Sequence, residues 1–98
     1  KNYIKAQEIL TKLIVEYPHA RRIAEAYFLL AESYFLSGQQ EKCLDVVYDM
    51  MTMFPSEEVT GFIMLRMGMI LTSRKKYYEA EEVYSAIRTH YPAHQGLN

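Results

Sequence analysis

The sequence predicts an all-α fold, an α-solenoid of antiparallel helix pairs with about five helices in a single domain. Its 98 residues contain an aromatic residue followed by proline three times, as Tyr17-Pro18, Phe54-Pro55 and Tyr91-Pro92, at equal separations of 37 residues. Within each period the apolar residues recur mostly three and four positions apart, which is the spacing of one helix face. Glycine and proline are few, with four and three residues, so a β-sandwich or barrel of many tight turns is disfavoured.

Other positions coincide at the same 37-residue shift, which makes the repeat hard to obtain by chance. One set is small and one is acidic, and two sets are apolar. These sets are Ala6, Cys43 and Ala80; Glu8, Asp45 and Glu82; Leu10, Val47 and Tyr84; and Leu13, Met50 and Ile87.

The five helices are expected near 2–16, 21–37, 40–53, 57–73 and 77–90. The first, third and fifth end at the aromatic-proline pairs, because a residue before proline is pushed out of helical geometry. The second ends at Ser37-Gly38, where glycine accepts the left-handed conformation of a helix terminus. Lys75 stands where the fourth helix would have this glycine, so that turn is less sharply specified.

This pattern resembles the tetratricopeptide repeat, whose signature is W-x2-L-G-x2-Y, then A-x3-F, then P. The first complete unit reads Tyr27-x2-Leu30-Ala31-x2-Tyr34, then Cys43-x3-Val47, then Pro55. The second reads Met64-x2-Met67-Gly68-x2-Leu71, then Ala80-x3-Tyr84, then Pro92. A lone second helix with Ala6-x3-Leu10 and Pro18 precedes them.

The resemblance covers nearly the whole chain and implies a right-handed superhelix. It divides the chain into the second helix of an incomplete repeat (1–18), two repeats (19–55 and 56–92) and a tail (93–98). Helices that cross closely need small residues, and Ala31 and Gly68 are expected to fill this place in the first helices of the units, with Ala6, Cys43 and Ala80 in the second helices. The period exceeds the usual 34 residues and is similar to the long-repeat variety of bacterial cell-envelope proteins. A periplasmic or envelope location is therefore slightly favoured over the cytoplasm.

In this family the first helices of the units line the concave face, so the resemblance also indicates candidate partner-binding residues. The set is unusually apolar: Phe28, Leu29, Glu32, Phe35, Phe62, Leu65, Arg66 and Met69. One interpretation is a groove for an amphipathic helix or an extended segment. The other is a face that packs against further helices of the same protein, since an exposed apolar patch marks a contact of some kind.

Arg66 has two interpretations of its own. It can bind a carboxylate of a partner through two hydrogen bonds, or it can pair with a neighbouring acid such as Glu32 or Glu25. The second is favoured, because weak surface pairs of this kind are common.

The composition argues against several other functions. The net charge is −1 and the pI is about 6.3, which does not suit nucleic-acid binding. The longest apolar run, from Gly61 to Leu71, contains Arg66 and is shorter than the roughly 20 residues that span a bilayer. The single Cys43 is expected to be an inert buried thiol. His90 and His94 could mimic a metal pair, but Pro92 lies between them and further ligands are missing.

No phosphate-binding loop, nucleophile with its base or carboxylate pair is found, so neither a catalytic site nor a cofactor is expected. The sequence favours a scaffold that binds a peptide or partner subunit in an apolar concave groove. Two alternatives stay open: structural spacer or self-assembly repeats, and a regulatory segment of an enzyme. Because solenoids need polar terminal caps and neither outermost helix has one, self-association through these ends is also expected.

Overall fold

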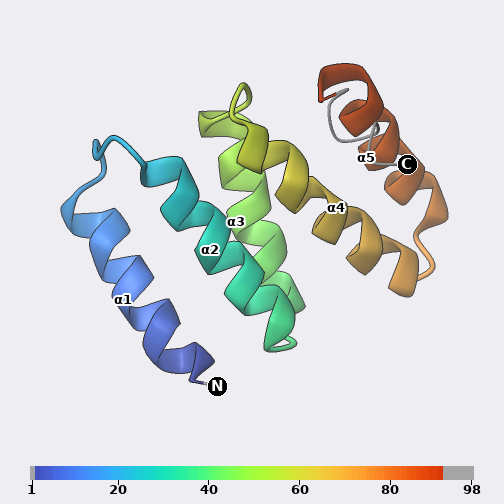
Figure 1. The fold of residues 1–98 in the computed structure, drawn as a ribbon. Coiled ribbons are helices and arrows are strands. Elements are labelled where there is room, and N and C mark those ends of the chain that lie inside the picture. Colours follow the sequence, from blue (N-terminus) through green and yellow to red (C-terminus); the bar gives the residue numbers. More distant parts are fainter. Residues whose placement is uncertain (1, 92–98) are drawn as a thin grey trace.

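The computed structural model of the chain describes residues 2–91. The expected tail at 93–98, the end of the last repeat at Pro92 and His94 lie outside the described residues. Five helices follow one another across the molecule (Figure 1): α1 (Tyr3–Glu16), α2 (Ile23–Leu36), α3 (Gln40–Met53), α4 (Glu58–Ser73) and α5 (Tyr77–His90). No strand occurs between residues 2 and 91. The expected all-helical fold is confirmed, and each helix begins and ends within two residues of its predicted bounds.

The 37-residue period is also present in the backbone. The helices α1, α3 and α5 begin at residues 3, 40 and 77 and end at residues 16, 53 and 90. Each stops at the aromatic residue before a proline, with φ of −130°, −130° and −134° at Tyr17, Phe54 and Tyr91. Because proline forbids helical geometry in the residue before it, the same sequence pair produces the same helix end three times.

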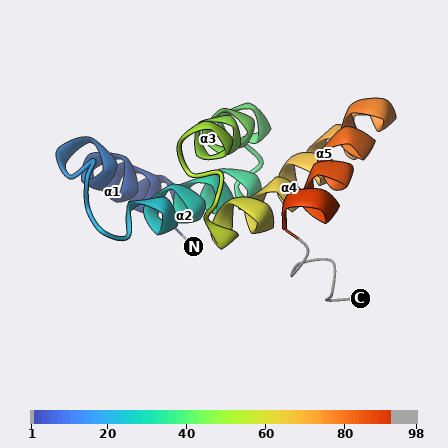
Figure 2. The same cartoon turned by 90° about the horizontal axis from the view of Figure 1, so that it is seen from above.

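Helices that are adjacent in the chain pack together as pairs, and α4 also contacts both α2 and α3. Seen from above, α1 and α3 lie on the same side of α2 (Figure 2). The core fills the space between these helices, and its fully buried members include Val47, Met50, Ile63 and Met67. The contacts between successive pairs make this a helical repeat, in which neighbouring units share one continuous core.

The two tight turns between paired helices have the same hydrogen bonds in spite of their different sequences. After α2, Gln39 donates its backbone N–H to the carbonyl of Tyr34 at 2.8 Å, and Gly38 has φ +81°. After α4, Lys76 donates to Leu71 at 2.9 Å. Lys75 there adopts φ +62°, a left-handed conformation that side chains other than glycine rarely take. Both ends are Schellman motifs.

The small residues that the sequence places at helix crossings are buried, with the exception of Ala6. Ala31 and Cys43 are fully buried, and Ala80 is nearly so. Gly68 is in contact with α5, since a Cβ built on it would lie 2.6 Å from two ring carbons of Tyr84. The expectation for Ala6 is wrong, because this residue is exposed. On α1 it is the next residue, Gln7, that faces α2 and is buried.

The described helices also answer the question of a membrane span. Between residues 2 and 91, no helix has both the length and the hydrophobicity that crossing a bilayer requires.

Candidate interaction surface

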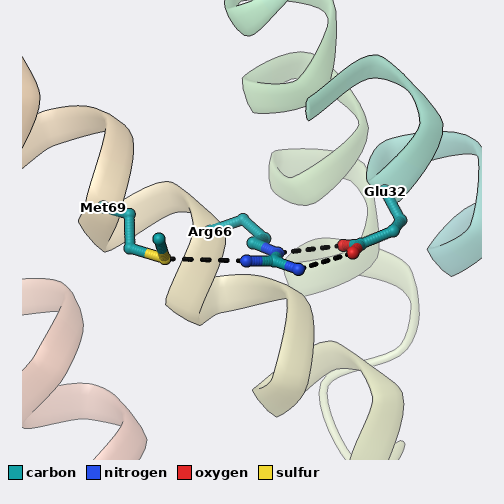
Figure 3. A network of polar contacts seen from close by, with 3 residues as sticks. All are labelled: Glu32, Arg66 and Met69. Carbon is teal, nitrogen blue, oxygen red and sulfur yellow. Dashed lines mark hydrogen bonds and ion pairs between the residues drawn. The ribbon is translucent and has the colours of Figure 1, made fainter. Parts of the chain in front are cut away.

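The predicted residues of α2 and α4 meet around an ion pair that joins the two helices (Figure 3). Arg66 of α4 donates from Nε to Glu32 Oε1 at 3.0 Å and from Nη2 to Glu32 Oε2 at 2.6 Å. This two-point geometry fixes the orientation of the guanidinium as well as its position. Arg66 therefore pairs with a neighbouring acid of its own chain, as the favoured interpretation of the sequence expected.

Two further side chains hold the guanidinium from other directions. Its central carbon lies 4.5 Å from the ring centroid of Phe35, a stacked arrangement in which cation and ring attract each other. On the side of the guanidinium away from Glu32, Arg66 Nη1 is 3.8 Å from the sulfur of Met69 (Figure 3). The hydrogen bond to Glu32, and secondarily the charge of Glu32, raises the pKa of Arg66 above its usual value, while burial acts against this. The arginine is thus charged and held in place by three side chains.

Exposed apolar side chains lie one helical turn from each member of the ion pair. On α2, Leu29 and Leu36 are three residues before and four residues after Glu32 and are 52% and 53% exposed. On α4, Phe62 and Met69 stand four residues before and three residues after Arg66, and both are exposed. Residues at these spacings share a helix face. We call the surface formed by Leu29, Glu32, Phe35, Leu36, Phe62, Arg66 and Met69 the α2/α4 face.

Two of the eight predicted residues contribute little to this face. Phe28 and Leu65 are half-buried and pack against the core. Their side chains support the helices from below, so substituting them would disturb packing as well as any contact with a partner.

Cys43 of α3 is fully buried, as expected, and lies within electrostatic range of the ion pair. Burial, and to a smaller extent the charge of Glu32, raises the pKa of its thiol to about 11, while Arg66 acts in the opposite direction. The thiol is accordingly protonated at neutral pH and is shielded from reagents while the chain is folded.

A second hollow, with apolar and acidic lining residues, was missed by the sequence reasoning. This groove of about 340 Å³ is lined by residues of α3, α4 and α5, among them Tyr48, Met51 and the largely buried Met64 and Met67, together with two glutamates of α5. A smaller hollow of about 310 Å³ shares Met51 and Met64 and reaches Tyr91. The signal in the sequence was the cluster of methionines at helical spacing, which are adaptable contacts in cores and in binding surfaces alike. We call this surface the α3/α5 groove.

A further hollow, of about 660 Å³, lies beside α1 and is lined by residues that include Gln7, Tyr34, Gln39 and Lys42. A polar network forms part of its wall. Gln7 Nε2 donates to Ser33 Oγ at 3.1 Å, and Gln39 Nε2 donates to Gln7 Oε1 at 3.3 Å. In the described part of the chain, every buried side-chain nitrogen and oxygen has a hydrogen-bond partner. This network is therefore satisfied within the chain and ties α1 to the turn between α2 and α3.

The described residues contain no group of three or more histidine, cysteine or acidic side chains arranged to hold a metal ion. Comparisons with protein-family models, with curated proteins and with solved structures find no significant match to this chain.

Proposed function

We propose that this chain is a non-catalytic interaction module of the tetratricopeptide-repeat type that binds a polypeptide segment on its α2/α4 face. The observation that carries the proposal is the Arg66–Glu32 pair, fixed at the centre of a face with exposed apolar side chains. The repeat of 37 residues with its aromatic-proline helix ends supports the assignment to this class of scaffold.

The chemistry of the face indicates what kind of segment it suits. Glu32 and Arg66 satisfy each other through two hydrogen bonds, so the centre of the face is close to neutral and calls for no charged partner group. Leu29 and Met69 offer apolar area, which contributes about 25 cal/mol per Å² when it is covered. An amphipathic helix with large apolar residues three and four apart fits this arrangement.

The rigid ion pair would favour binding in a second way. Ordering a flexible side chain at an interface costs about 0.5–1.5 kcal/mol. Arg66 is already held by Glu32, Phe35 and Met69, so most of this cost is met within the free chain. A partner that stacks apolar groups on the arginine would also strengthen the pair by excluding water from it.

The test uses peptides selected from a displayed library of random sequences, with affinity measured by fluorescence anisotropy. Leu29→Glu and Met69→Glu place a charge on exposed positions of the face, so helicity should be kept. Each should weaken binding of a selected peptide by about tenfold or more. The matched control is Tyr48→Glu, because Tyr48 is also exposed but lines the α3/α5 groove.

Two outcomes would contradict the proposal. The first is a selection that returns no binding peptide under conditions in which a known peptide-binding repeat domain returns one. The second is binding that survives both substitutions on the face and is lost in Tyr48→Glu, which would move the site to the α3/α5 groove.

A further inference from the structure

One flank of α1, next to its buried side, carries a stripe of apolar residues that no described helix covers. Its members are three or four positions apart: Ala6, Ile9, Leu13 and Tyr17. Ile9 is 57% exposed, Leu13 39% and Tyr17 62%. The buried side of the same helix is marked by Gln7, which bonds to Ser33 of α2. We call this set of four residues the open stripe of α1.

The internal repeat shows what the equivalent stripe does elsewhere in the molecule. On α3 the matching Val46 and Met50 are buried, and Phe54 meets the ring of Tyr27 of α2 at 5.3 Å between centroids. On α5 the matching Ala80 and Ile87 are buried, and α5 packs against α4. In both cases a helix covers the stripe. The open stripe of α1 therefore has the shape and composition of a helix-packing surface.

We propose that the open stripe of α1 pairs with the α1 of a second copy of this chain, in antiparallel orientation, to form a symmetric dimer. This surface is separate from the α2/α4 face, so the proposal does not depend on the proposed function. Three pairings within α1 support a second copy as the occupant.

The first two pairings are matches of size. In an antiparallel pair, Ile9 faces Leu13 of the second copy, which brings two branched aliphatic side chains together. On each side of this centre, the small Ala6 of one copy faces the large Tyr17 of the other. The exposed ring of Tyr17 fits best against a small side chain. Alternation of large and small residues across facing helices allows their side chains to interlock.

The third pairing is a match of charge. Lys5 and Glu16 both flank the open stripe beside Ile9, because at 3.6 residues per turn they lie close to the same angle on the helix. Antiparallel packing places Lys5 opposite Glu16 of the second copy, twice per dimer by symmetry. Among the described residues, Glu16 forms an exposed ion pair of 4.0 Å with Lys12, a weak contact that leaves it able to form the new pair.

All three pairings share one crossing point. The midpoints of the three pairs, 5 and 16, 6 and 17, and 9 and 13, all fall at position 11 or within half a residue of it. Antiparallel packing about that point satisfies the aliphatic, the small-to-large and the ionic pairings at once. The agreement in size and charge is what favours this occupant over an unrelated helix.

Sedimentation equilibrium of the 98-residue chain from low to high micromolar concentration tests the dimer. We expect a monomer–dimer equilibrium that stops at two chains. Leu13→Glu should weaken it by about tenfold or more while leaving the circular dichroism spectrum unchanged, since Leu13 is exposed. Val15→Glu is the control, because Val15 is exposed and, two residues after Leu13, lies on nearly the opposite side of the helix. This variant should associate like the original chain.

A charge exchange between two variants tests the orientation. In Lys5→Glu and in Glu16→Lys alone, both ion pairs of the antiparallel dimer become repulsive, so each variant should self-associate roughly tenfold more weakly. Mixing the two restores both pairs and should give a mixed dimer as stable as the original. A chain that stays monomeric to high micromolar concentration would overturn the proposal. So would association that survives Leu13→Glu, or variants that fail to recover on mixing.

Discussion

Gly68 of α4 lies against the hydroxyl end of the Tyr84 ring of α5, and a Cβ at position 68 would come within 2.6 Å of two ring carbons. Glycine inside a helix costs about 1 kcal/mol relative to alanine. This cost is offset here by the close approach of α5, because contact with a large ring adds dispersion and buried apolar area.

We therefore expect Gly68→Ala to lower the free energy of unfolding by about 1–3 kcal/mol in spite of its better helix propensity, and Gly68→Leu to lower it further. Urea denaturation followed by circular dichroism measures both. In a Tyr84→Ala background the ring is gone, and Gly68→Ala should then stabilise the chain by up to about 1 kcal/mol. An increase in stability from Gly68→Ala in the original chain would show that the ring moves aside without cost.

Lys75 holds a left-handed conformation, with φ +62°, at a turn where the preceding unit has Gly38. That conformation costs a residue with a Cβ about 1–2 kcal/mol. Lys75→Gly should relieve this strain and raise the free energy of unfolding by about 1 kcal/mol. The gain is partly offset because glycine has more conformational entropy in the unfolded chain. Gly38→Lys should lower the free energy of unfolding by a similar amount, and thermal denaturation of the two variants provides the comparison. Equal shifts of the same sign would mean that the two turns are not equivalent.

Cys43 gives the stability a pH dependence of defined sign. Its pKa is raised from 9.0 to about 11 by burial first and by Glu32 second. The unfolded chain loses the thiol proton near pH 9 while the folded chain keeps it, so the contribution is complete below pH 9 and is lost as the pH rises toward 11. Tyr27 and Tyr91, whose pKa values burial also raises, act in the same direction.

Comparison with Cys43→Ala isolates the thiol from the tyrosines. The difference in unfolding free energy between the original chain and this variant should shrink as the pH rises from 9 to 11. A difference that stays constant over this interval would contradict a buried thiol. Thiol reagents at neutral pH should react with Cys43 only in denaturant.

The Arg66–Glu32 pair provides a further test, because lysine keeps the charge of arginine but has neither its two-point geometry nor its flat stacking surface. Arg66→Lys should lose the double hydrogen bond to Glu32 and the contact with Phe35. We expect a fall of about 1 kcal/mol in the free energy of unfolding, measured by urea denaturation. Arg22→Lys is the control, since Arg22, the residue just before α2, is far more exposed and pairs with Glu25 in the first turn of that helix. This substitution should change stability much less.

The sequence predicts much of this fold because the signals that end its helices are local. The aromatic-proline pairs at Pro18 and Pro55, and Gly38 in the turn between them, act on their immediate neighbours. The repeat then transfers these helix ends along the chain. It also places Gly68 at a close crossing, but it does not identify Tyr84 as the residue above it, because that depends on how two helices rotate against each other.

Equivalence between repeats fails where the neighbours differ. Ala6 matches Cys43 in the sequence, yet one is exposed and the other fully buried, since α1 packs on one helix and α3 on two. The candidate site, too, could be predicted from the sequence only in part. The sequence brings Glu32 and Arg66 to one face, while their double hydrogen bond and the α3/α5 groove depend on side-chain geometry across three helices.

The most direct measurement of the central claim is NMR spectroscopy of the methionine methyl groups during titration with a peptide selected on this chain. Met69 lies on the α2/α4 face, whereas Met51 and Met64 line the α3/α5 groove, and Met50 and Met67 are fully buried. Binding on the α2/α4 face should shift the Met69 resonance in proportion to peptide bound and leave those of Met51, Met64 and Met50 nearly unchanged. Shifts at Met51 and Met64 with none at Met69 would contradict the account.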